Sequence, residues 1–162
     1  MHSFPLSGRQ ALRRGRVSIP GQIYLLTTTT RHRRPLFADI ASARAVSRVI
    51  YSASTWRDSR LLAWVLMPDH WHGLLQLGDE SLGRVMNRFK GGTSRVLHVA
   101  GKMEGAPWDR SFHDHALRSG EDVRKVARYI VANPIRAGLV DNVLGYPYWN
   151  AVWLEYDPST LL

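Results

Sequence analysis

The sequence predicts an α+β fold, a ferredoxin-like split βαβ sandwich in which an antiparallel sheet carries helices on one face. Apolar residues at three- and four-residue spacing indicate two amphipathic helices, at residues 38–54 and 81–99. Runs rich in β-branched and aromatic residues precede, separate and follow these helices. A further helix at residues 120–133, which carries a tyrosine, is expected to be added to this core on its C-terminal side.

The first half of the chain is predicted to supply a strand, a helix and a hairpin. Residues 23–30 combine Leu, Tyr and Thr, and the charged segment after them closes with Pro35. Two apolar runs, at residues 61–67 and 70–77, form the hairpin. They are joined through Pro68-Asp69, residue types that favour a tight turn. The start of the second hairpin strand is therefore expected at one end of the sheet.

The second half is predicted to supply a helix, a strand and the tyrosine-bearing helix. The helix at residues 81–99 contains two glycines within its apolar stripe, and residues 110–118 follow as the last strand. Ser119 is a natural N-cap for the helix at 120–133, and acidic residues occupy its first turn, where the helix dipole favours anions. The aromatic segment 146–162 has no assigned element, and it either packs against the domain or stacks on bases.

The chain is expected to form one domain at residues 21–145, between a basic N-terminal arm at 1–20 and an aromatic tail at 146–162. Its 162 residues suffice for one core and are few for two. With 44% apolar and 22% charged residues, the composition is that of a globular protein. Because cysteine is absent, disulfides and thiolate metal sites are excluded. No apolar run approaches the ~20 residues of a membrane span, so a cytoplasmic protein with no membrane partner is expected.

The charge of the chain indicates a polyanionic partner. Lys and Arg number 22 against 13 Asp and Glu, which gives a net charge of +9, and 19 of the 22 are arginines. The planar guanidinium pairs with phosphates and guanine edges, so this bias favours nucleic acid over an idle basic surface. The candidate contacts, each of which is a solvated charge on the alternative interpretation, are Arg9, Arg13, Arg14 and Arg16 in the arm and Arg88, Lys90, Arg95, Arg110 and Arg118 in the domain.

Two histidines stand one residue apart at the start of the second hairpin strand. Side chains alternate along a strand, so His70 and His72 share one face and Trp71 points to the other. Neutral imidazole is a common metal ligand, and a strand holds such a pair rigidly. A second pair with the same spacing, His113 and His115, shows that the spacing alone is not specific. Which of the two pairs is the candidate metal site has to be decided from the surrounding motifs.

The helix at residues 120–133 carries a second candidate pair. Its apolar residues form one stripe, and Tyr129 and Asn133, four residues apart, lie on a shoulder beside it. Pro134 is expected to stop the helix at Asn133. A phenol and an amide oxygen thus share an edge between core and solvent. The structural alternatives are a half-buried aromatic anchor for the tyrosine and a helix-terminal residue for the asparagine.

Together these motifs resemble a known family. His70-Trp71-His72 has the form found in HUH single-strand endonucleases, and residues 129–139 resemble the tyrosine helix of single-tyrosine transposases. More narrowly, the chain resembles the REP-associated tyrosine transposases, which act on repetitive extragenic palindromes in bacterial genomes, from about residue 21 to residue 153. A familiar form of the first motif has Asn in place of Asp69 and a smaller residue in place of Trp71. Neither difference touches a proposed ligand.

The resemblance implies a metal-dependent endonuclease and strand transferase that acts on single-stranded DNA with palindromic hairpins. His70 and His72 would bind a divalent metal with Asn133 as third protein ligand, and Tyr129 would be the nucleophile. The expected cofactor is Mg²⁺ or Mn²⁺; Mn²⁺ suits imidazole better, and zinc is compatible by ligand type. In this family the product is a 5′-phosphotyrosine and a free 3′-hydroxyl.

Several points stay open on the residues alone. His113 and His115 are expected to support the site or face DNA, with buried core histidines as the alternative, and Trp71 is expected in the core, with base stacking as its alternative. The rival functions are a non-catalytic DNA or RNA hairpin-binding protein and a phosphoesterase that uses water. A monomer that acts in cis at the nucleoid is favoured over a dimer.

Overall fold

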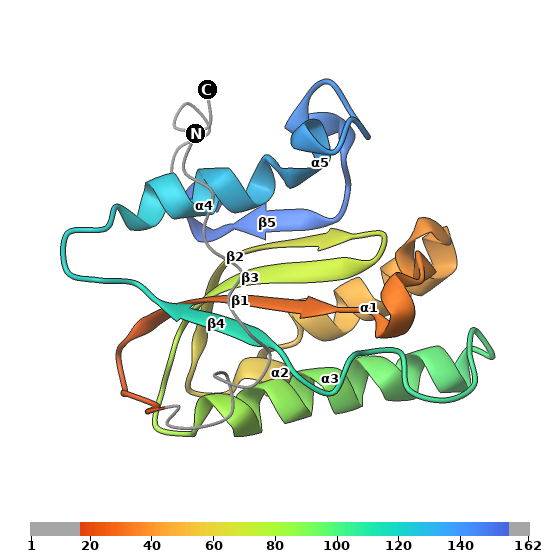
Figure 1. The fold of residues 1–162 in the computed structure, drawn as a ribbon, viewed down its shortest axis with the longest axis horizontal. Helices are drawn as coiled ribbons and strands as arrows, with labels where there is room; N and C mark the ends of the chain where they lie inside the picture. The colour runs from red at the N-terminus through yellow and green to blue at the C-terminus, as the bar shows by residue number, and fades with distance from the viewer. Residues whose placement is uncertain (1–16, 156–162) are drawn as a thin grey trace.

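The computed structural model describes residues 17–155, with side chains through Trp153, and contains a five-stranded antiparallel sheet (Figure 1). The strand order is β4-β1-β3-β2-β5. The first four strands have the order of a split βαβ fold, in which β3 lies between β1 and β2, so the predicted fold class is confirmed. The strands are β1 (Ile23–Thr29), β2 (Arg60–Met67), β3 (His70–Gln76), β4 (His113–Ala116) and β5 (Trp149–Ala151).

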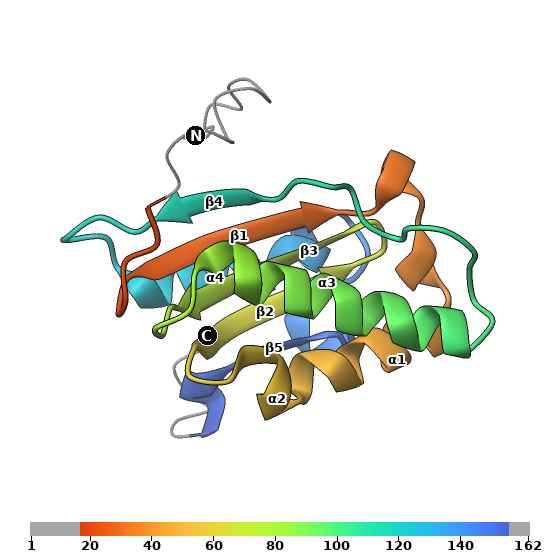
Figure 2. The same ribbon diagram turned by 90° about the horizontal axis from the view of Figure 1, so that it is seen from below.

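Helices cover both faces of this sheet. Three of them lie on one face, as Figure 2 shows from that side: α1 (Ile40–Tyr51), α2 (Ala53–Trp56) and α3 (Leu82–Val99). On the other face lie α4 (Val123–Val131), which carries the tyrosine, and α5 (Asn133–Arg136). Short 3₁₀ turns connect these elements: η1 (Arg31–Arg33), η2 (Leu36–Ala38), η3 (Val143–Gly145) and η4 (Val152–Glu155). Among the described residues, no helix combines the length and apolar character of a membrane span.

The core between the sheet and α1–α3 is rich in aromatic side chains. Trp71 is fully buried there, 4.6 Å from the Phe89 ring and 5.9 Å from the Trp56 ring. Its indole also lies over Gly73, where an added Cβ would come within 2.1 Å of it, so that only glycine fits. Trp71 is therefore a core residue, and its alternative as a base-stacking surface is wrong because no DNA base can reach it.

The core on the other face is smaller and holds α4 against the sheet. Ala127 and Ile130 of α4 are buried together with Val65, Met67 and Leu74 of the central strands. The apolar stripe predicted for this helix thus faces β2 and β3. Tyr129 stays outside the stripe and is half exposed, as its predicted shoulder position requires.

Several element ends differ from the predictions. The helix expected at 38–54 divides at Ser52 into α1 and α2. The strand expected at 110–118 pairs with β1 only over its four residues in β4, because backbone groups before β4 bond Lys90 instead. The N-cap of α4 is Asp122, whose carboxylate accepts two backbone N–H groups, and not Ser119. In the predicted tail, β5 pairs with β2, so this part packs against the domain.

Helical structure continues past the position where the sequence predicted its end. α4 ends at Val131 and α5 begins at Asn133, with Pro134 near its start, where the missing N–H costs nothing. Proline cannot donate to the carbonyl four residues before it, that of Ile130. The side-chain amide of Asn133 donates to this carbonyl instead, at 3.0 Å. Pro134 therefore bends the path of the helix and redirects the chain toward the end of the β2–β3 hairpin (Figure 1).

Candidate active site

His70 and His72 lie at the start of β3 on the sheet face that α4 and α5 cover. Their rings stand 4.8 Å apart and nearly perpendicular, with 82° between their planes. In the antiparallel register, Thr27 of β1 and Val65 of β2 lie on either side of His72. Because the pair belongs to an interior strand, hydrogen bonds from two neighbours fix its backbone. The strand and the shared face that the sequence predicted for the pair are thus observed.

One nitrogen of each imidazole has a hydrogen-bond partner. The Asp69 carboxylate lies 2.6 Å from Nδ1 of His70, and the Thr27 hydroxyl lies 2.7 Å from Nδ1 of His72. A carboxylate only accepts, so Nδ1 of His70 is the donor and its Nε2 carries the lone pair. The hydroxyl of Thr27 can accept from Nδ1 of His72 in the same way. Both Nε2 atoms can then act as ligands on the same side of the sheet.

His72 is held in its neutral form. Burial is the main cause of its lowered pKa, which is about 3 against an ordinary value of 6.5. Nearby positive charges add to the shift, in the order His70, Arg136 and Arg33. A metal ligand has to be unprotonated, so this environment keeps the imidazole ready to bind a metal at neutral pH.

Tyr129 is placed beside the histidine pair by the helical turn that follows it. The Arg136 guanidinium lies 3.9 Å from the centre of the Tyr129 ring and donates to the Tyr129 carbonyl at 2.7 Å. The same guanidinium is one of the charges that lower the pKa of His72. α5 contacts β2 and stands over the end of the β2–β3 hairpin where the histidines lie (Figure 1). The helix that carries Tyr129 and the histidine pair therefore lie on the same face of the sheet.

Asn133 is oriented by the break between α4 and α5. Its side-chain nitrogen donates to the carbonyl of Ile130, which fixes the plane of the amide. The amide oxygen accepts no hydrogen bond from the described residues and is the atom that a metal would use. The helix-terminal role that the sequence offered as an alternative is thus also present, because the nitrogen performs it.

The residues present fit a divalent metal. Two imidazoles on a rigid strand, each with its Nδ1 held by a hydrogen bond, are a donor set that borderline metals accept. No group of three or more His, Cys, Asp or Glu side chains suited to a metal occurs within residues 17–155. The fit therefore involves the amide of Asn133, solvent or a phosphate oxygen beside the imidazoles.

The second histidine pair lies on the same sheet face but in a different environment. His113 pairs with Thr27 across β1, so it stands in one row with His72, two strands away. It is exposed, and His115 is 40% exposed and lies 3.4 Å from the Glu121 carboxylate. Buried core histidines, one of the alternatives for this pair, are therefore wrong.

Two of the predicted DNA contacts have partners inside the protein. Arg88 donates to the Glu80 carboxylate at 2.5 Å and to the Thr55 carbonyl at 2.7 Å. Lys90 donates to two backbone carbonyls of the loop before β4, both at 2.8 Å. Both belong to α3, on the face opposite the histidine pair. This placement argues against phosphate contacts by Arg88 and Lys90.

The other predicted contacts divide into two groups. Arg95 on α3 and Arg110 and Arg118 on either side of β4 are exposed, and only the last two belong to the strand that carries the second histidine pair. The residues predicted for the basic arm, Arg9, Arg13, Arg14 and Arg16, lie outside the described residues.

Sequence reasoning missed three residues that hold the site together: Thr27, Arg33 and Arg136. Arg33 lies 3.4 Å from the far oxygen of the Asp69 carboxylate, in a turn where His32 and Arg33 both have positive φ, 59° and 54°. Such backbone is strained and tends to occur at functional sites. The alternation of strand 23–30 could have placed Thr27 on the histidine face, but the register was needed to place it against His72.

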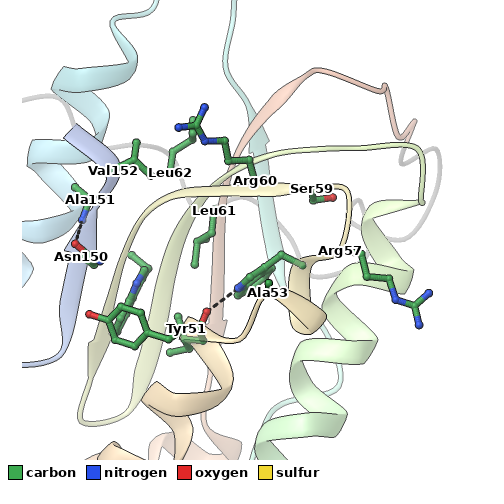
Figure 3. Close-up of a pocket in the computed structure, with 13 residues that line it drawn as sticks. Tyr51, Ala53, Arg57, Ser59, Arg60, Leu61, Leu62, Asn150, Ala151 and Val152 are labelled. Carbon is green, nitrogen blue, oxygen red and sulfur yellow. Dashed lines mark hydrogen bonds between the residues drawn. The ribbon is translucent and has the colours of Figure 1, made fainter. Parts of the chain in front are cut away.

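A cavity in the described part of the chain lies away from the histidine pair. It has a volume of about 250 Å³ and opens between the end of α1, α2 and the edge formed by β2 and β5. Figure 3 shows Tyr51, Arg60 and Asn150 among its lining residues. Neither the histidines nor Tyr129 line it, so this cavity is not part of the candidate active site.

Comparisons with known proteins agree with this arrangement. The family model described as "Transposase IS200 like" matches residues 19–133. A REP-associated tyrosine transposase of Escherichia coli (strain K12) is 27% identical over 135 residues, which cover 82% of this chain and 78% of that protein. A putative REP-associated tyrosine transposase of Haemophilus influenzae is 29% identical over 98 residues, 54% of this chain and 56% of that protein.

Solved structures are similar as well. The structure of a REP-associated tyrosine transposase bound to a REP hairpin matches with a TM-score of 0.70 and 26% identity, over 85% of this chain and 81% of that chain. A putative transposase from Deinococcus radiodurans matches with a TM-score of 0.53 over 73% of this chain and 95% of that chain. At 21% identity, the second match bears on the fold alone.

Proposed function

The chain belongs to the IS200-like transposase family, and from this premise we propose that it is a metal-dependent endonuclease and strand transferase of single-stranded DNA. The observation that carries the proposal is the meeting of two elements. A pre-oriented histidine pair on β3, in which burial keeps His72 neutral, lies on the sheet face that α4 covers with its half-exposed tyrosine. These are the parts that a tyrosine nucleophile and a metal-bound phosphate require.

His70, His72 and the amide oxygen of Asn133 would hold the metal, Mg²⁺ or Mn²⁺. When bound, it would polarise the scissile phosphate and orient it. Asp69 and Thr27 keep each Nδ1 engaged, so that the Nε2 atoms stay available. This support costs no rearrangement at the time of reaction, because the hydrogen bonds already exist in the protein alone.

Tyr129 would act as the nucleophile. Its phenolic oxygen forms a bond to phosphorus while the bond between phosphorus and the 3′ oxygen breaks. The phenolic proton passes to water, and the leaving 3′ oxygen gains a proton from water. The DNA is left with a 5′ phosphate on the tyrosine and a free 3′-hydroxyl. Because the new ester keeps the energy of the old one, the hydroxyl can attack it and rejoin the strand.

We propose hairpins of repetitive extragenic palindromes as the substrate. The net charge of +9 supports a polyanion, and the similar structure at a TM-score of 0.70 is one bound to a REP hairpin.

The proposal is tested by covalency. Incubation with a single-stranded palindromic hairpin and Mn²⁺ should give a protein–DNA adduct on a denaturing gel, and Tyr129→Phe should lose it by at least about 10³-fold. Cleavage that persists in Tyr129→Phe would replace the tyrosine mechanism with attack by water. Tight hairpin binding without cleavage in any divalent metal would indicate a binding protein.

We further propose that Tyr129 serves the histidines of its own chain as a monomer. The contact of Arg136 with Tyr129 and the packing of α4 on β2 and β3 support this arrangement, since they need no second chain. Mixing His72→Ala with Tyr129→Phe separates the alternatives. In cis, the mixture should form no more adduct than either variant alone. Restoration of the adduct on mixing would show that a partner supplies the tyrosine.

A further inference from the structure

Arg136 occupies an unusual place between the two halves of the site. Its guanidinium carbon lies over the Tyr129 ring, 3.9 Å from the ring centre, and one of its N–H groups donates to the Tyr129 carbonyl. Guanidinium carries five N–H donors. Within residues 17–155, the Tyr129 carbonyl is the one hydrogen-bond acceptor found for them. The remaining donors are therefore available beside the nucleophile.

A structural role explains part of this placement. The break between α4 and α5 frees carbonyls at the end of α4, and a cation at that end is favourable. Any hydrogen-bond donor, however, could cap the end of α4, so capping alone does not require the contact with the Tyr129 ring. The stack fixes the Tyr129 side chain, which is half exposed and has little core packing to hold it. Arg136 is thus a cap that also orients the nucleophile.

The charge of Arg136 extends to the other half of the site. It contributes to the lowered pKa of His72, although it belongs to a different element from the histidine. Asp69, the acidic residue beside His70, is bonded to Arg33 and to His70 itself. The guanidinium on α5 thus lies against the tyrosine, and within residues 17–155 it forms no ion pair with a carboxylate.

We propose that Arg136 binds the scissile phosphate, holding its non-bridging oxygens between Tyr129 and the histidine pair. The inference rests on the proposed function and deepens it by naming the group that receives the reacting anion. A planar, permanently charged fork matches a phosphodiester through two N–H groups. With the ring on one side and the phosphate at its edge, Arg136 sets the distance between the attacking oxygen and phosphorus.

The first test measures adduct formation in single turnover at saturating hairpin and Mn²⁺. Arg136→Gln keeps an N–H donor for the Tyr129 carbonyl but removes the charge, and it should slow the adduct about 10²-fold. Arg136→Lys keeps the charge but lacks the planar, forked guanidinium. Its rate of adduct formation should therefore lie between those of Arg136→Gln and the wild type. The matched control, Arg124→Gln, removes the same charge from the exposed surface of α4 and should stay within about threefold.

Melting temperature and circular dichroism show whether each variant is folded. A folded Arg136→Gln variant that forms the adduct at the wild-type rate overturns the inference. If Arg124→Gln is slowed as much as Arg136→Gln, the effect is one of net charge and the inference is also overturned.

The second test needs no catalysis and no metal. Hairpins that carry a neutral methylphosphonate at one backbone linkage at a time are titrated by fluorescence anisotropy in EDTA. At one linkage, the methylphosphonate should weaken hairpin binding to the wild type about tenfold but leave binding to Arg136→Gln unchanged, because Arg136 binds only a charged phosphate. That linkage should be the one cleaved in Mn²⁺.

The two tests separate the inference from the function on which it rests. No linkage with this dependence on Arg136, or a dependent linkage other than the cleaved one, overturns the inference while the adduct of the wild type still supports the function. A wild type that forms no adduct but shows one Arg136-dependent linkage overturns the function and leaves Arg136 as a phosphate-binding residue.

Discussion

The two histidine pairs of this protein have the same spacing, the same sheet face and different surroundings. His70 and His72 stand on an interior strand under α5, where Asp69 and Thr27 engage both Nδ1 atoms. His113 and His115 stand on the edge strand β4, exposed or partly exposed to solvent. The alternation of a strand makes both pairs point the same way, so the pattern is shared.

The spacing therefore places two imidazoles on one face of a sheet and does nothing more. Ligand quality depends on what holds the other nitrogen, on how far burial suppresses protonation and on which helix lies above. Only the first pair has all three. The edge strand β4 has a neighbour on one side only, which leaves His113 and His115 more open to water.

The largest effect should come from deleting one imidazole of each pair. His72→Ala removes a ligand from the metal and should lower adduct formation by at least about 10³-fold, with hairpin affinity largely intact. His113→Ala, in the same row of the sheet, should change the rate by less than about tenfold. Single-turnover kinetics with Mn²⁺ measures both. Equal losses in the two variants would mean that the two histidine pairs act together and do not differ in function.

A smaller effect should follow from removing the acidic partner of each pair. Asp69→Ala leaves Nδ1 of His70 without its acceptor and should weaken Mn²⁺ binding about 10- to 100-fold in isothermal titration calorimetry. Glu121→Gln, the matched change beside His115, should leave Mn²⁺ affinity unchanged. Asp69→Asn keeps an acceptor oxygen and should retain most of the affinity. If Asp69→Ala bound Mn²⁺ as the wild type does, orientation by Asp69 would be unimportant.

The smallest effect concerns the pH dependence of stability without metal. The pKa of His72 is about 3 when folded and near 6.5 when unfolded, so between these values the unfolded chain binds the extra proton. Stability is therefore complete above pH 6.5 and falls as the pH falls toward 3. From pH 7.5 to 5.0 the loss attributable to His72 should be about 2 kcal/mol.

Urea unfolding of the metal-free protein at the two pH values measures this loss. The difference should be smaller by about that amount in His72→Gln, with His113→Gln as the control for loss of an exposed imidazole. A wild type and His72→Gln with the same pH dependence would show that His72 is not buried in its neutral form.

Much of the fold follows from local patterns. The spacing of apolar residues places α3 and α4, and the tight turn at Pro68-Asp69 joins β2 to β3. Element ends were less predictable, since the N-cap at Asp122 in place of Ser119 and the short β4 depend on hydrogen bonds between elements. The resemblance to REP-associated tyrosine transposases, drawn from the order of the motifs, is confirmed by the similar proteins and structures.

The site divides in the same way. His70, His72, Tyr129 and Asn133 could be named from the sequence because their spacing repeats that of a known family. Arg88 and Lys90 could not be sorted from other basic residues, because a charge has no sequence pattern that tells an internal ion pair from a DNA contact. Thr27, Arg33 and Arg136 act on the site from elements that are far from it in the chain or beyond the predicted end of a helix.

The sequence by itself determined which side chains share a face, because the periods of strand and helix are local properties of the backbone. It thereby determined that His70 pairs with His72 and that Tyr129 stays off the buried stripe of its helix. Which histidine pair lies on an interior strand and which on an edge strand was decided by the tertiary structure, because strand order and register depend on contacts between distant segments. The tertiary structure also decided that helical structure continues through Pro134, so that Arg136 turns back onto Tyr129.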